Sequence, residues 1–204
     1  MPRQKTGPGA RCIPIMRIMG VDPGIAQTGY GIIDASANGN RLGYVASGVI
    51  ATPPRVAFVE RLSRIYEEVD AIIRRYRPSC LAIEDVFFAK NPRAALLLGH
   101  ARGVVLLSAA RCGVPVYAYS ATAIKAALCR FGSASKRQVT SMAAVLLGAR
   151  GRLSTHAADA LAAGICHAHT QGFAARLSIK DTPCRGPAAP ARVPLAPDKK
   201  VSRS

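Results

Sequence analysis

The stretch IPIMRIMGV at residues 13–21, followed by DPG at residues 22–24, decides the fold of this chain. Its side chains are mostly apolar, it is short, and Asp-Pro-Gly is a turn signal, so the pattern predicts a strand that ends at Asp22. Two further stretches with strand character follow at residues 28–34 and 42–51. Three successive short strands are most simply joined as an antiparallel meander.

The hydrophobic period then changes. Between residues 58 and 76, Leu62, Ile65 and Val69 recur at helical spacing with charges between them, which predicts an amphipathic helix. Residues 80–83 form a short apolar run that stops at Glu84 and is typical of a buried strand. We expect a helix from Asn91-Pro92 to about 111 and a strand at 114–119. Three further helices are expected near 121–130, 135–147 and 155–169, with Ser120, Ser135 and Ser154 as their capping residues. This order predicts an α/β or α+β sheet with helices on its faces.

The 204 residues allow one domain with room for a tail, and half of them are hydrophobic. Lys and Arg number 28 against 11 Asp and Glu, a net charge of +17, and residues 18–170 keep 17 bases against 9 acids. This excess favours a polyanionic partner such as nucleic acid. A basic composition alone also fits a ribosomal or architectural protein, or a bias toward solubility.

The two ends differ from the centre of the chain. Residues 183–197 contain five prolines and four alanines, a composition that cannot form a packed core. We therefore expect a disordered extension at 1–15, a folded domain at 16–170 and a disordered basic tail at 171–204. No apolar run reaches the length of a membrane helix and the first residues do not form a secretory signal, so we expect a cytoplasmic protein without membrane contact. The six cysteines have no CxxC spacing, which favours free thiols.

Three of the acids occupy unusual positions. Asp22 and Glu84 each end an apolar strand, and Asp159 lies within the small apolar run AADALAA at 157–163. A carboxylate in such a setting is costly to bury unless it is paired or binds a metal. Three of them together suit Mg²⁺ or Mn²⁺, and a pair of such ions can hydrolyse a phosphodiester. The alternative is that Asp22 and Asp159 only cap a turn and a helix.

Histidines add a second candidate feature. His156 precedes Asp159 by three residues, so the two share a helix face, and His156 can serve as a metal ligand or as a proton carrier. The alternative is an ordinary histidine at a helix start. His167 and His169 beside Cys166 have no partner pair elsewhere and are interpreted as a helix end.

An ordered set of motifs resembles the RuvC family of Holliday-junction resolvases, from about Met16 to His169. They are Gly20-Val21-Asp22-Pro23-Gly24 with Thr28-Gly29-Tyr30-Gly31, Ala82-Ile83-Glu84 with Val86-Phe87 and Ala89-Lys90-Asn91, Gly99-His100-Ala101-Arg102-Gly103, and Ala157-Ala158-Asp159-Ala160-Leu161-Ala162. The resemblance implies an RNase H-like fold, a mixed five-stranded sheet flanked by helices. It also implies a homodimer acting on four-way junction DNA, with the RuvA-RuvB branch-migration complex as a further partner.

The resemblance also implies residue roles. Asp22, Glu84 and Asp159 would hold Mg²⁺, two ions per site, for which Mn²⁺ may substitute. His156 stands where family members usually carry a fourth acid, although some carry histidine. Phe87 matches an aromatic position near the junction centre, where it can stack on an unpaired base. Lys125 and Lys136 match positions that contact the DNA backbone, and charge and location add Lys90, Arg93 and Arg137.

The implied reaction is hydrolysis by water, with symmetric nicks in two strands of like polarity and products that carry 5′-phosphate and 3′-hydroxyl ends. Two rival hypotheses remain. The Asp-x-Gly opening with glycines downstream also resembles the phosphate loop of actin-like ATPases and sugar kinases, which would require a second, similar domain. A non-catalytic DNA-architectural protein would account for the charge but leaves Asp22, Glu84 and Asp159 without a purpose.

Overall fold

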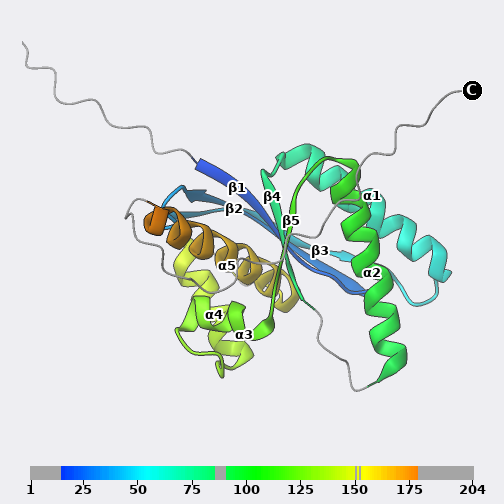
Figure 1. The fold of residues 1–204 in the computed structure, drawn as a ribbon. Helices are drawn as coiled ribbons and strands as arrows, with labels where there is room; N and C mark the ends of the chain where they lie inside the picture. Colours follow the sequence, from blue (N-terminus) through cyan, green and yellow to red (C-terminus); the bar gives the residue numbers. More distant parts are fainter. Residues whose placement is uncertain (1–14, 86–90, 150, 152, 179–204) are drawn as a thin grey trace, which may run out of the picture.

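The computed structural model describes residues 15–85, 91–149, 151 and 153–178, and its centre is one five-stranded mixed sheet (Figure 1). The strands lie in the order β3-β2-β1-β4-β5. Their bounds are β1 (Ile15–Asp22), β2 (Gln27–Ser36), β3 (Leu42–Ala51), β4 (Cys80–Glu84) and β5 (Val116–Tyr119). β1, β2 and β3 pair antiparallel, whereas β4 is parallel to both β1 and β5. The predicted meander and the mixed five-stranded sheet are confirmed.

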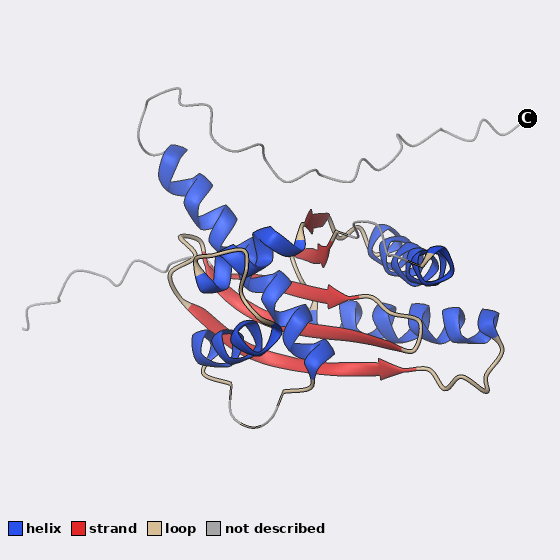
Figure 2. Cartoon of the chain, turned by 90° about the horizontal axis from the view of Figure 1, so that it is seen from below, coloured by secondary structure: helices blue, strands red, loops and turns tan. Residues whose placement is uncertain are grey.

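Five described helices cover the two faces of the sheet (Figure 2). They are α1 (Phe58–Tyr76), α2 (Pro92–Arg111), α3 (Ala121–Cys129), α4 (Lys136–Leu147) and α5 (Thr155–Ser178). Alternate side chains of β1 point to opposite faces, so Met19 packs with α1 and α2 while Ile18 packs with α3, α4 and α5. The central strands are therefore apolar on both faces, which explains their nearly continuous hydrophobic sequence.

The helix starts agree with the expected capping residues. The Asn91 side chain accepts a hydrogen bond from the Arg93 backbone N–H at 2.9 Å, directly before Pro92. Ser120 caps α3, and Ser135 forms a capping box with Gln138 at the start of α4. Each cap satisfies backbone donors that have no partner inside the helix, so these boundaries follow from local sequence.

The C-terminal helix extends further than expected. α5 continues to Ser178, past the helix end expected near 169 and the domain boundary expected at 170. No proline interrupts residues 171–182. Gly172 also packs on the turn between β2 and β3, where a Cβ on this residue would lie 2.4 Å from the Asn38 carbonyl oxygen. His167 and His169 consequently lie inside α5, and their interpretation as a helix end is wrong.

Helix α2 has an unusually apolar surface. Among the described residues it is the one helix long and apolar enough to cross a membrane by length and composition, whereas the sequence was expected to hold no such run. Its inner face packs on α1 and the sheet through Ala101, Val105 and Ala109. Leu96 and Leu107 are 63% and 55% exposed. The apolar character of α2 thus comes from two faces, of which one is uncovered.

Candidate active site

Helix α5 lies unusually close to the sheet because glycines face it. A Cβ on Gly20 of β1 would lie 1.8 Å from the Ala160 carbonyl oxygen, and one on Gly29 of β2 would lie 2.1 Å from the His156 carbonyl oxygen. Only hydrogen at these positions leaves room for the helix backbone. The first turns of α5 are therefore held directly over the end of β1, which brings His156 and Asp159 toward Asp22.

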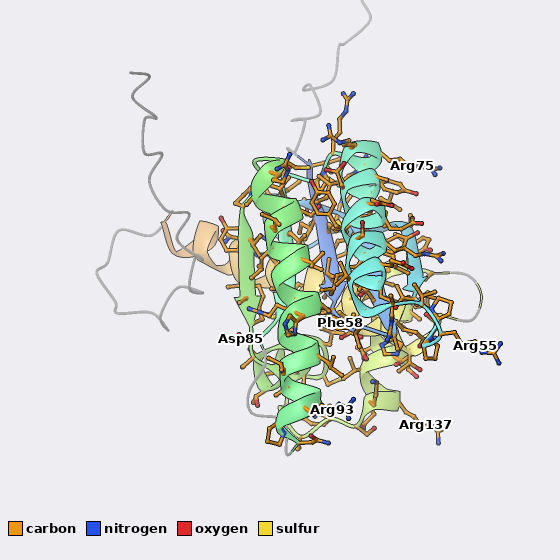
Figure 3. The ribbon with its side chains drawn as sticks, turned by 90° about the vertical axis from the view of Figure 1, so that its right-hand side faces the viewer. Arg55, Phe58, Arg75, Asp85, Arg93 and Arg137 are labelled. Carbon is orange, nitrogen blue, oxygen red and sulfur yellow. The ribbon has the colours of Figure 1, made fainter. Side chains whose placement is uncertain are left out.

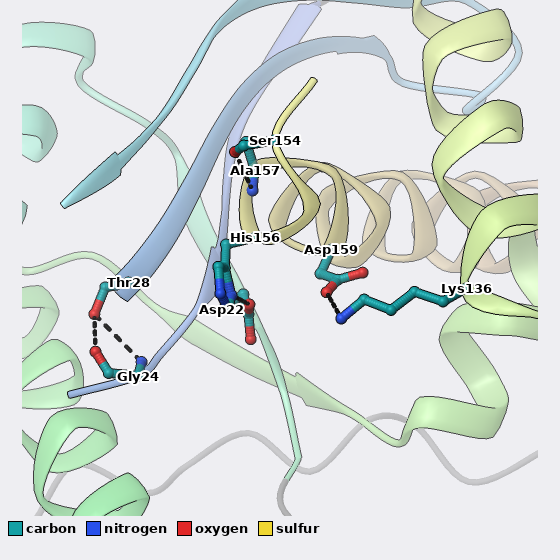
Figure 4. Close-up of polar contacts among 8 residues, drawn as sticks. All are labelled: Asp22, Gly24, Thr28, Lys136, Ser154, His156, Ala157 and Asp159. Carbon is teal, nitrogen blue, oxygen red and sulfur yellow. Dashed lines mark hydrogen bonds and ion pairs between the residues drawn. The ribbon is translucent and has the colours of Figure 1, made fainter. Parts of the chain in front are cut away.

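The end of β1 is fixed by its turn. Thr28 is fully buried, and its hydroxyl donates to the Gly24 carbonyl oxygen at 2.8 Å while accepting from the Gly24 N–H at 3.3 Å (Figure 4). Asp22 pairs with Gly29 across the antiparallel ladder. At the other end of the site, the Ser154 hydroxyl accepts from the Ala157 N–H at 3.3 Å and caps α5. Both ends of the site are therefore held by local hydrogen bonds.

Two of the predicted acids are paired with basic side chains. The Asp22 Oδ2 atom lies 2.8 Å from Nδ1 of His156, and the Asp159 Oδ2 atom lies 2.7 Å from Nζ of Lys136 (Figure 4). Each pair joins distant parts of the sequence. The alternative that Asp22 and Asp159 only cap a turn and a helix does not account for these contacts, because neither carboxylate makes a described capping bond.

Glu84 joins the same region from the neighbouring strand. Val21 and Ile83 are partners in the parallel ladder between β1 and β4, so Asp22 and Glu84 follow at the same sheet edge. Glu84 and Asp159 line one hollow of about 240 Å³ together with Lys125 and Lys136. The structure therefore gathers the three predicted acids and the two predicted lysines from β1, β4, α3, α4 and α5.

The electrostatics reflect this gathering. Burial raises the pKa of Asp22. The hydrogen bond with His156 works against this shift, whereas the negative charge of Asp159 adds to it. Burial also raises the pKa of Glu84, and the charges of Asp22 and Asp159 add to the shift. The hydrogen bond to Asp159 raises the pKa of Lys136. The carboxylates repel one another at this edge, and a cation placed among them would relieve that repulsion.

The donor set fits a hard divalent cation. Carboxylate oxygens are the ligands that such ions prefer, and His156 adds one nitrogen. Within the described ranges, no three His, Cys, Asp or Glu side chains are already close enough to surround one ion. Asp22 is instead hydrogen-bonded to His156, and Asp159 is paired with Lys136. The nitrogen of Lys136 thus stands beside Asp159 where a cation would bind.

Arg102 is a site residue that the sequence did not reveal as such. Its guanidinium donates to the Glu84 carbonyl oxygen and lies 3.2 Å from the Asp85 carboxylate. This contact ties α2 to the end of β4, next to Glu84. The available signal was the position of Arg102 within the Gly99-His100-Ala101-Arg102-Gly103 motif, but the motif does not show which backbone group the side chain binds.

The remaining predicted DNA contacts divide into two groups. Phe87 and Lys90 lie outside the described residues. Arg93 and Arg137 are exposed in the first turns of α2 and α4 (Figure 3), and neither has a described contact with the acidic residues. Lys125, by contrast, is half-buried beside Glu84.

Comparison with known proteins gives consistent matches. The family described as "Crossover junction endodeoxyribonuclease RuvC" matches residues 18–167. The RuvC of Bordetella avium is 45% identical over 80% of this chain and 89% of its own length, and that of Geobacter sp. is 46% identical over 79% and 98%. The structure of Thermus thermophilus RuvC in complex with Holliday junction substrate superposes with a TM-score of 0.72 at 36% identity, over 80% of this chain and 96% of that one.

The fold and the acidic sheet edge define an RNase H-like nuclease, a class whose chemistry depends on divalent metal. The candidate carboxylates at this edge are Asp22 of β1, Glu84 of β4 and Asp159 of α5. The chain belongs to the RuvC family of crossover junction endodeoxyribonucleases.

Proposed function

We propose that this chain resolves four-way DNA junctions by hydrolysing one phosphodiester in each of two strands of like polarity, leaving 5′-phosphate and 3′-hydroxyl ends. The observation that carries the proposal is the hollow in which Glu84 and Asp159 face Lys125 and Lys136, next to Asp22. Acids for a cation and bases for a phosphate lie together, as phosphodiester hydrolysis requires. Membership of the family and the likeness to a junction-bound relative support it.

Asp22, Glu84 and Asp159 would hold two Mg²⁺ ions, with His156 as a further ligand and Mn²⁺ as a substitute. The bound ions supply an activated water and charge stabilisation at the leaving 3′-oxygen. The protein itself must position these acids and limit their contact with solvent. Burial keeps the acids away from bulk solvent, and the close packing of α5 on Gly20 and Gly29 fixes where they can lie.

The basic residues of the site act on the substrate. Lys125 and Lys136 line the acidic hollow, so a phosphate that enters it meets both ammonium groups. When a phosphate enters, Lys136 leaves Asp159 and contacts the phosphate. The Asp159 carboxylate is then free to bind a cation. His156 is held through Nδ1 by Asp22, which leaves Nε2 to serve in one of two ways, as the further ligand of the ion or as the carrier of a proton to or from the reacting oxygens.

A homodimer follows from the requirement for two cuts, because a single site would release a half-cut junction. The uncovered face of α2 supports it. Leu96 and Leu107 lie at its two ends, and between them Gly99 and Gly103 are exposed, with no atom of the described residues within 4 Å of a Cβ placed on either. Glycines one turn apart let a second helix approach closely while the leucines bury apolar surface. An isologous contact of this face gives a two-fold dimer.

We further propose that Phe87, Lys90, Arg93 and Arg137 contact DNA, that the RuvA-RuvB branch-migration complex is a partner, and that the protein works in the cytoplasm without membrane contact. Family membership supports the DNA contacts and the partner complex. The apolar surface of α2 needs no membrane, because a second copy of the chain would cover it.

The decisive experiment incubates the purified full chain with a synthetic four-way junction and Mg²⁺, comparing the wild type with Asp22→Asn. We expect paired, symmetric nicks from the wild type and loss of cleavage with junction binding retained in the variant. Asp34→Asn is the matched control, because Asp34 pairs with Arg17 away from the acidic edge. Cleavage that survives Asp22→Asn would overturn the metal-site assignment, and binding without cleavage by the wild type would favour an architectural protein.

A further inference from the structure

A second and larger hollow lies between α3 and α4. Its volume is about 760 Å³, within the range of sites that hold small ligands. We call it the α3–α4 hollow. The residues of its lining that matter here are Leu128, Arg130, Phe131, Arg137 and Ser141.

The α3–α4 hollow is positively charged. Arg130 and Arg137 are exposed, and neither guanidinium has an ion-pair partner within the part of the chain that the structure describes. No Asp or Glu is among the described residues that line the hollow. Two unpaired guanidinium groups over one concave surface favour a ligand with negative charges, and their planar geometry suits phosphate.

An aromatic side chain accompanies the arginines. Phe131 is 49% exposed, although a ring of this size is normally buried. The preceding Arg130 has a left-handed backbone with φ of 66°, which places it at the end of α3 in a conformation that favours glycine. Gly148 takes the equivalent position at the end of α4 with φ of 60°. The left-handed cap ends α3 here, as Arg77 with φ of 48° ends α1, and the chain then turns so that Arg130 and Phe131 both line the hollow.

The α3–α4 hollow adjoins the acidic hollow through the same two helices. Lys125 of the acidic hollow precedes Arg130 by about 7.5 Å along α3, given a rise of about 1.5 Å per residue. Lys136 of the acidic hollow is directly followed by Arg137. One DNA strand carries a phosphate for about every 3.4 Å of duplex axis, so cations about 7.5 Å apart can contact different phosphates of one strand that leaves the cut.

We infer that the α3–α4 hollow binds an unpaired nucleotide of the substrate strand next to the cleaved bond, with Arg130 and Arg137 on its phosphates and Phe131 stacked on its base. Cations combined with an exposed aromatic ring are how proteins hold single strands. This inference rests on the proposed function and adds a positioning subsite to it. Stacking would also make cleavage depend on which base lies there.

The chain contains no tryptophan, so a single reporter can be placed in the hollow. The test uses the full-length Phe131→Trp protein, titrated with a synthetic four-way junction in Ca²⁺ to prevent cleavage. Binding is followed independently by the anisotropy of a dye on the DNA. We expect the indole emission to be quenched in parallel with binding. Tyr44→Trp is the matched control, because Tyr44 is 40% exposed on β3 and far from the acidic edge in the sheet register.

The outcomes separate the two proposals. Junction binding with unchanged emission from Phe131→Trp would overturn the subsite and leave the proposed function intact. Absence of junction binding by the wild type would overturn the proposed function, and the subsite with it. Equal quenching of Phe131→Trp and Tyr44→Trp would also overturn the subsite, because it would show a general effect of bound DNA.

A second measurement does not depend on a new aromatic group. Phe131→Ala is expected to weaken junction binding roughly tenfold or more. The combined change of Arg130→Ala and Arg137→Ala should reduce the magnitude of the slope of log affinity against log salt by about two for each subunit that binds the junction. Arg64→Ala, an exposed arginine on α1 across the sheet, should leave the slope unchanged. A slope equal to that of the wild type in the combined Arg130→Ala and Arg137→Ala variant would contradict phosphate binding in the hollow.

Discussion

Replacing Gly20 by alanine should separate helix α5 from the sheet. The added Cβ would lie 1.8 Å from the Ala160 carbonyl oxygen, whereas real Cβ atoms do not come closer than 3.0 Å, so the helix backbone must retreat by at least 1.2 Å. The Gly164 backbone nitrogen, 2.9 Å away, closes the alternative direction. Both obstacles are backbone atoms of one helix, and no rotamer change can relieve them.

The cost follows from this displacement. Overpacking of a tight core typically costs about 1–3 kcal/mol. Since the contact is with backbone, we expect the upper half of that range, which lowers Tm by roughly 4–12 °C for a chain of this size. Asp159 and His156 move with α5, and a misplacement of about 1 Å at a reactive centre can reduce the rate about 100-fold. Junction binding depends on surface cations and should change little.

The assay measures Tm by thermal unfolding, single-turnover cleavage of a four-way junction, and junction binding by anisotropy. Gly43→Ala is the matched control, because its nearest atom would lie at 3.9 Å, an ordinary contact. A Gly20→Ala protein with the Tm and cleavage rate of the wild type would refute the close packing of α5. Equal losses in Gly43→Ala would show that strand glycines matter here for another reason.

Three other changes test separate parts of the molecule. His156→Ala should lose much of its cleavage rate while binding the junction as before, and an unchanged rate would make His156 an ordinary helix-start residue. Burial lowers the pKa of His167 from about 6.5 to about 4. As the pH falls, His167 is therefore protonated in the unfolded chain at a higher pH than in the folded chain. Stability should therefore fall by up to about 3 kcal/mol between pH 6.5 and pH 4. Denaturant titrations should show this fall in the wild type but not in His167→Gln, and identical pH profiles would refute it. Leu107→Glu should convert the dimer to a monomer in sedimentation experiments and leave single nicks in the junction, whereas an intact dimer would exclude the α2 face as the interface.

Most of the fold could be predicted because its signals are local. The strand ending at Asp22, the helix starting after Asn91 and the capping box at Ser135 depend on residues within a few positions of one another. The length of α5 could not be predicted in this way. It depends on Gly172 packing against Asn38, a contact between residues far apart in the chain.

The candidate site shows the same division. Asp22, Glu84 and Asp159 stand out in the sequence because each is an acid in an apolar setting. The contact of His156 with Asp22 depends on how α5 lies over β1, which the motifs do not specify. The contact of Arg102 with the Glu84 carbonyl oxygen likewise needs the position of α2 relative to β4. The sequence predicts the candidate groups from their local setting, whereas the side chains and carbonyl groups that they contact depend on tertiary packing.

The ion pair between Lys136 and Asp159 means that the acidic edge carries its own counter-charge. Many small metalloproteins unfold when a chelator removes their metal, because the ion is part of the folding free energy. Here Lys136 already pairs with Asp159 in the folded chain, and His156 is hydrogen-bonded to Asp22. Lys136 therefore offsets the charge of Asp159 before any ion binds, and we expect the chain to stay folded when a chelator removes its metal.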